Sequence, residues 1–167
     1  MDAFSVRTKI MIGGGMDALA QRLHRVFLVT DKFMDESGKT NYVTDRLLRN
    51  SGEFKIFSDV QADPDIATVT RGVEQILEFQ PDAVVAFGGG SAIDAAKAIV
   101  FFAARERDMR DCKFIAIPTT SGTGSEVSRF AVITDREKGV KYPLVEDSLL
   151  PDIAILDAEL TLSLIHI

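Results

Sequence analysis

The chain has 167 residues, of which 46% are hydrophobic and 26% are charged, a composition that suits one globular domain with a substantial core. Its formal net charge is -6 at pH 7 with no basic stripe, so we expect it not to bind nucleic acid, whose phosphates require clustered Lys and Arg. The single cysteine, Cys112, cannot form an internal disulfide, and neither a leader segment nor an apolar run of bilayer length is evident. We therefore expect a cytoplasmic protein that does not associate with membranes.

Short apolar runs alternate with helical patterns through the first part of the chain. The predicted strands are residues 9–12, 26–30, 55–57, 83–87 and 114–117. Between them, apolar residues at helical spacing predict helices over residues 16–23, 42–48, 66–77 and 92–104. This alternation predicts an α/β fold, a doubly wound, Rossmann-like parallel sheet with right-handed crossovers.

The pattern changes after the fifth predicted strand. Residues 130–134 and 141–145 flank a polar segment that ends in Gly139, which predicts a small β-hairpin extension. Residues 153–156 are of strand length and composition.

A glycine loop, Gly88-Gly89-Gly90-Ser91, separates the predicted strand 83–87 from the helix that follows it. Ligands of open α/β sheets bind at the carboxyl ends of the strands. Glycines let the backbone approach an anion closely, and a helix start offers unpaired N–H groups and the positive end of a dipole. The loop therefore predicts a phosphate site, although it matches neither GxGxxG nor the lysine-containing P-loop. The alternative is a tight turn that binds nothing.

Two acidic residues lie near the expected strand ends. Asp31 follows the strand 26–30, where a carboxylate can accept hydrogen bonds from ribose hydroxyls and repel a 2′-phosphate, which favours NAD over NADP. The same residue type is also common in turns. Asp94 is expected in the first turn of its helix, where a carboxylate is favourable with or without a ligand.

The second motif is a threonine loop, residues 118–126, which carries five hydroxyl side chains and two glycines. It can place polar groups around a ligand, or it can be a solvated loop. Lys141, in the predicted hairpin, can reach a phosphate or ribose, or remain a solvated surface lysine. His24 and His166 have no spacing typical of a metal site, so we predict no metal ligand and no catalytic residue.

Residues 88–97 and 118–127 together resemble the iron-containing (group III) alcohol dehydrogenases, including the ethanolamine- and propanediol-pathway enzymes. The likeness extends through residues 132–135, 141–143 and 150–152, up to about Leu164. It implies an NAD-binding α/β domain over residues 1–164 and a divergent tail at 165–167. It also implies that the C-terminal helical domain, which holds one aspartate and three histidines as metal ligands, is absent.

The resemblance implies a role for each matching residue. Asp31 is expected at the adenosine ribose, the glycine loop at the pyrophosphate, Asp94 on the nicotinamide side and Lys141 at the nicotinamide ribose. The full set of expected cofactor-binding residues is Asp31, Gly88, Gly89, Gly90, Ser91, Asp94, Thr119, Thr120, Thr123, Ser128, Val132 and Lys141.

The activity implied by the resemblance is NAD-dependent oxidation of a primary alcohol or reduction of an aldehyde. In such enzymes Fe2+ or Zn2+ polarises the alcohol oxygen while hydride passes to the nicotinamide. We expect this chain alone to be inactive for lack of metal ligands, and to form a homo-oligomer through an exposed apolar patch. Two alternatives stay open: a non-catalytic interaction or regulatory module that keeps the nucleotide fold, and a related sugar-phosphate cyclase or glycerol dehydrogenase.

Overall fold

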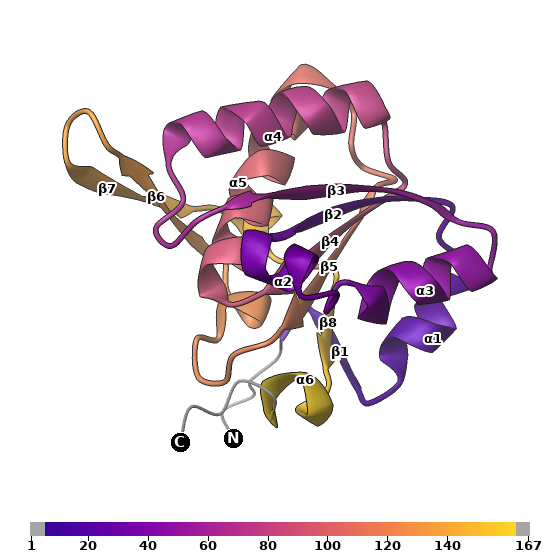
Figure 1. Ribbon diagram of the computed structural model, residues 1–167. Helices are drawn as coiled ribbons and strands as arrows, with labels where there is room; N and C mark the ends of the chain where they lie inside the picture. The colour runs from indigo at the N-terminus through magenta and orange to yellow at the C-terminus, as the bar shows by residue number, and fades with distance from the viewer. Residues whose placement is uncertain (1–5, 163–167) are drawn as a thin grey trace, which may run out of the picture.

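The computed structural model describes residues 6–162, and the predicted domain end at Leu164 and the tail at 165–167 lie outside that range. Its centre is a six-stranded sheet with the order β1-β8-β5-β4-β2-β3, in which all neighbouring strands are parallel (Figure 1). The strands are β1 (Lys9–Ile12), β2 (Arg25–Asp31), β3 (Glu53–Val60), β4 (Ala83–Gly88), β5 (Lys113–Pro118) and β8 (Ile153–Leu156). The predicted doubly wound, Rossmann-like parallel sheet is confirmed.

Helices cover both faces of this sheet, which explains why its central strands are continuously apolar. In β2, Phe27 and Val29 belong to the core beneath α4 and α5, whereas Val26 and Leu28 belong to the core beneath α1 and α3. The helices are α1 (Gly15–Ala20), α2 (Lys32–Glu36), α3 (Asn41–Arg49), α4 (Ile66–Phe79), α5 (Gly90–Glu106) and α6 (Ala158–Leu162). None of the described helices is long and apolar enough to cross a bilayer.

The helix boundaries follow their capping residues. α4 begins where predicted because the Asp65 carboxylate accepts a hydrogen bond from the Thr68 N–H at 2.8 Å. The short helix α2 was not predicted; Asp31 caps it by accepting from the Met34 N–H at 2.9 Å. The predicted helix over residues 16–23 is too long, because α1 ends at Ala20.

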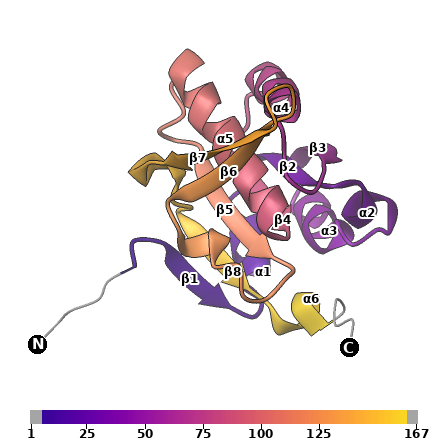
Figure 2. The same cartoon turned by 90° about the vertical axis from the view of Figure 1, so that its left-hand side faces the viewer.

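The predicted hairpin is formed by β6 (Phe130–Asp135) and β7 (Val140–Val145), which pair antiparallel. It lies across α5 on the side away from the sheet (Figure 2), with Ala131 and Ile133 buried. The Thr134 N–H donates to the Pro64 carbonyl at 2.9 Å, which joins the hairpin to the loop before α4. Helix α5 is therefore enclosed between the sheet and the hairpin.

Candidate nucleotide-binding site

The glycine loop and the threonine loop lie side by side at the carboxyl edge of the sheet. Gly88 and Pro118 are register partners at the ends of β4 and β5, so both loops leave the sheet at the same level. A cavity of about 410 Å³ opens between them and the end of β2. Six of the predicted residues line it: Asp31, Gly89, Gly90, Ser91, Thr119 and Thr120. The structure therefore brings together half of the predicted set around one space.

Close packing of the two loops depends on the absence of side chains in the glycine loop. Gly88 has φ +150, and a Cβ there would lie 2.8 Å from the Cβ of Ala92. A Cβ on Gly89 would lie 3.3 Å from the Thr120 Oγ1. Any larger residue would fill the space between the loops and press on the threonine.

The N-terminus of α5 faces this space with unpaired donors. Gly89 is the N-cap in an extended conformation, and its carbonyl accepts from the N–H groups of Ala92 and Ile93. Within residues 6–162, the N–H groups of Gly90 and Ser91 have no hydrogen-bond acceptor, as is usual for the first turn of a helix. Together with the dipole of a 17-residue helix, they suit a phosphate group.

Asp31 is fixed at the rim of the cavity. Its Oδ1 is used as the cap of α2, so part of its role is the turn chemistry considered above. Its Oδ2 lies next to the glycine loop, 3.7 Å from the position of a Cβ on Gly88. The carboxylate is held in one orientation and keeps an acceptor oxygen near the cavity.

Thr119 carries a buried hydroxyl without a described partner. Its side chain is 1% exposed, its N–H donates to the Gly88 carbonyl at 2.9 Å, and its Oγ1 has no hydrogen bond among the described residues. A buried hydroxyl without a partner is unfavourable, so a polar ligand in the adjoining cavity would stabilise it. On the other side of Thr120, a second cavity of about 370 Å³ extends over the ends of β5, β8 and β1. The space along the strand ends is thus longer than a single phosphate needs.

The expected place of Asp94 in the first helical turn is wrong. Because Gly89 caps the helix, α5 begins at Gly90, and Asp94 is one turn further along. Its carboxylate accepts from the Ser125 hydroxyl at 2.5 Å and from the Val132 N–H at 3.1 Å. It bonds within the protein, and its contact with the nicotinamide side stays a prediction.

The remaining predicted residues lie beside the cavity or on the hairpin side of α5. Thr123 packs against Gly90, since a Cβ on Gly90 would lie 3.4 Å from the Thr123 Cγ2. The Ser128 carbonyl and hydroxyl accept from the buried Lys97, and the Lys141 ammonium donates to the Asp63 carboxylate at 2.7 Å. The Lys97 contact was not predicted from the sequence, because it depends on tertiary packing.

No three or more His, Cys, Asp or Glu side chains within residues 6–162 lie together in a way that could hold a metal ion. His166 lies outside that range. Cys112 is not a candidate nucleophile, because burial, reinforced by Asp82 and Asp152, raises the pKa of its thiol to about 12.

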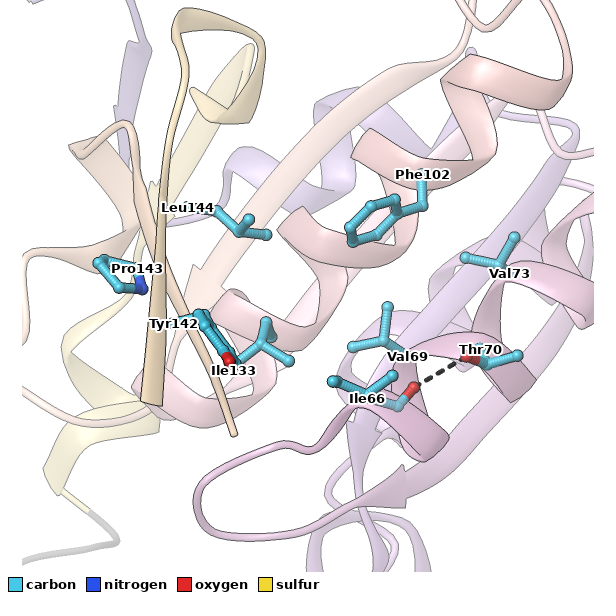
Figure 3. Close-up of a pocket in the computed structure, with 9 residues that line it drawn as sticks. All are labelled: Ile66, Val69, Thr70, Val73, Phe102, Ile133, Tyr142, Pro143 and Leu144. Carbon is cyan, nitrogen blue, oxygen red and sulfur yellow. Dashed lines mark hydrogen bonds between the residues drawn. The ribbon is translucent and has the colours of Figure 1, made fainter. Parts of the chain in front are cut away.

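A larger cavity, of about 560 Å³, lies away from the strand ends, between α4, α5 and the hairpin (Figure 3). Its walls are nearly all apolar, and the Thr70 hydroxyl there already donates to the Ile66 carbonyl at 2.9 Å. The lining residues are Ile66, Val69, Thr70, Val73, Phe102, Ile133, Tyr142, Pro143 and Leu144. With so few free donors, this cavity does not suit a dinucleotide.

Comparison with protein families matches residues 8–158 to the iron-containing alcohol dehydrogenases. The 1-propanol dehydrogenase PduQ of Citrobacter freundii is 44% identical over 165 residues, which cover 98% of this chain and 44% of that protein. The bifunctional aldehyde-alcohol dehydrogenase AdhE of Escherichia coli K12 is 39% identical over 162 residues, which cover 84% of this chain and 18% of that protein.

Two solved structures extend this similarity to the fold. The iron-containing alcohol dehydrogenase of Thermococcus thioreducens has a TM-score of 0.83 and 31% identity, covering 95% of this chain and 47% of that one. The sulfoacetaldehyde reductase of Bifidobacterium kashiwanohense, solved in complex with NAD+, has a TM-score of 0.81 and 32% identity, covering 98% of this chain and 48% of that one. The chain thus spans less than half the length of these relatives.

Proposed function

Because this chain belongs to the iron-containing alcohol dehydrogenase family, we propose that it is the NAD(H)-binding domain of an alcohol dehydrogenase and binds the dinucleotide along the carboxyl edge of its sheet. The observation that carries the proposal is the start of α5, where the Gly90 and Ser91 N–H groups face a cavity with Thr119 and Thr120 opposite. The pyrophosphate is assigned to this end of the helix.

The other residues of the cavity fit the rest of a dinucleotide. The Asp31 carboxylate is placed to accept from ribose hydroxyls, and the unpaired Thr119 hydroxyl supplies a polar contact. The second cavity, which lies across Thr120 from the glycine loop, provides room for one of the two bases of the dinucleotide. The NAD+ complex of the related sulfoacetaldehyde reductase supports this assignment.

When bound, NAD(H) supplies the hydride acceptor or donor for interconversion of a primary alcohol and an aldehyde. The described residues bind and orient the dinucleotide, but they do not fit an iron or zinc site, and we assign no step to a metal. We propose that residues 1–167 alone bind the nucleotide without turning over alcohol. Cytoplasmic residence and homo-oligomerisation remain predictions.

Titration of the purified chain with NADH tests the proposal. Gly89→Val places side-chain atoms between the two loops, where even a Cβ would be 3.3 Å from Thr120. Loss of a charge-assisted contact to phosphate costs about 1.5–3 kcal/mol, so the Kd should rise about 10- to 150-fold. The matched control is Gly14→Ala, because Gly14 is the N-cap of α1 and lies outside the cavity.

An unchanged Kd for Gly89→Val would remove the glycine loop from the proposal. A folded wild-type chain that binds no NADH would favour the alternative, a non-catalytic interaction or regulatory module that keeps the nucleotide fold.

A further inference from the structure

A buried lysine joins α5 to the segment that precedes the hairpin. The side chain of Lys97 is 0% exposed, although it lies in a helix of mostly small and apolar residues. Its Nζ donates to the Ser128 carbonyl at 2.8 Å, the Ser128 hydroxyl at 3.2 Å and the Phe130 carbonyl at 2.7 Å. All three protons of the ammonium group therefore have acceptors, and all three acceptors belong to residues 128–130.

Burial of this charge is unfavourable in itself. Desolvation lowers the pKa of Lys97 to about 8, while the carboxylates of Asp94 and Glu126 act in the opposite direction. An apolar side chain of similar length would fill the same position without that cost. What the ammonium adds is the set of bonds to Ser128 and Phe130.

Asp94 completes the connection from one turn earlier in the same helix. It accepts from the Ser125 hydroxyl and the Val132 N–H. Two opposite charges on one face of α5 thus hold residues 125–132, which run from the end of the threonine loop into β6. The same helix begins at Gly90 and Ser91, where the pyrophosphate is assigned.

We propose that Lys97 is a positioning residue, which sets where the threonine loop and the β6–β7 hairpin lie relative to the phosphate-binding end of α5. Lys97 does not line the cavity; it acts through Ser128 and Phe130. The part of the inference that concerns the nucleotide rests on the proposed function, whereas the part that concerns residues 125–132 does not.

Lys97→Met is the direct test, because methionine has a similar length and no charge. Lys55→Met is the matched control, since Lys55 pairs with Glu78 at the surface, away from the cavity. Amide hydrogen exchange of the nucleotide-free chain should become at least about tenfold faster in residues 125–132 and stay unchanged in β4. The Kd for NADH should rise in Lys97→Met and not in Lys55→Met.

Unchanged exchange in residues 125–132, or equal acceleration in β4, would overturn the positioning role. If the wild-type chain binds no NADH, the proposed function fails, and the exchange result still decides the role of Lys97.

If Lys97→Met does not fold, the wild-type chain provides the test. Deprotonation of the ammonium removes one donor, so the amide NMR signals of residues 128–132 should shift together with a midpoint near pH 8. Among the described residues, Asp94 and Glu126 are the charged groups that act on Lys97. Amide signals of residues 128–132 that stay fixed through the pH at which the Lys97 ammonium itself titrates would overturn the proposal.

Discussion

Replacement of Asp31 by serine should shift the relative affinity of this chain for the two nucleotides from NADH towards NADPH. Serine can still cap α2 by accepting from the Met34 N–H, so the fold around the rim is retained. A 2′-phosphate bound about 5 Å from the Asp31 carboxylate would meet a repulsion of roughly 1–3 kcal/mol at effective dielectric constants between those of a protein surface and water. Removal of the carboxylate should therefore change the ratio of the two Kd values by about 5- to 150-fold in favour of NADPH.

Fluorescence titrations with both nucleotides at fixed ionic strength measure that ratio, and added salt should reduce the effect. Asp65→Ser is the control, because Asp65 caps α4 in the same way and does not line the cavity. A folded Asp31→Ser variant with the wild-type ratio would show that the Asp31 carboxylate does not face the 2′ position.

Three further substitutions address packing, the hairpin and the buried charge. Gly72→Ala would bring a Cβ against the Ile99 Cδ1 and to 2.7 Å from the Ile99 Cγ1, so overpacking should exceed the gain in helix propensity and lower the free energy of unfolding in urea by about 1–2 kcal/mol. Adding Ile99→Val, which removes Cδ1 and keeps Cγ1, should restore part of this loss, and no loss in the single variant would contradict the α4–α5 packing. Asp63→Asn releases Lys141 from an exposed ion pair, so the free energy of unfolding should change by less than about 1 kcal/mol. The Kd for NADH should fall by up to about fivefold, and a further Lys141→Met change should abolish this gain in affinity. The pKa of Lys97 is about 8 in the folded chain and 10.5 ordinarily, so the unfolded chain binds more protons between pH 8 and pH 10.5. The free energy of unfolding in urea of the wild type, relative to that of Lys97→Met, should therefore rise with pH in this range, by up to about 1.4 kcal/mol per pH unit. A difference that does not change with pH would refute the lowered pKa.

The fold was predictable because its signals are local and repeated. Central strands such as β4, all six residues of which are buried, are continuously apolar, and the helices α4 and α5, with apolar residues at helical spacing, follow β3 and β4. The five-residue helix α2 escaped prediction because it is too short for periodicity, and only the cap at Asp31 marks it. The end of α1 was misplaced because Leu23, which lies in the connection after the helix, is also buried. Its position in the sequence continues the apolar pattern of the helix.

The part of the candidate site that could be predicted is the glycine loop, because its backbone conformation depends only on neighbouring residues. A run of glycines between a strand and a helix predicts an anion site wherever that strand lies in the sheet. The partners of Asp94 and Lys97 are more than 30 residues away along the chain, and no spacing rule connects them. Their roles require the hairpin to lie on α5, and the sequence predicted the hairpin but not its position.

The small residues of α5 connect these two parts of the site. Ala95, Ala96 and Ala98 are fully buried, so at these three positions only a methyl group lies between α5 and the elements that pack on it. This close approach brings the Lys97 ammonium within hydrogen-bonding distance of β6, and it holds the N-terminus of the helix at the end of β4. A larger side chain at one of these alanines would displace the helix, and with it both the hairpin and the N–H groups proposed to bind phosphate. The geometry of the proposed nucleotide site therefore depends on how closely α5 packs as much as on the glycine loop itself.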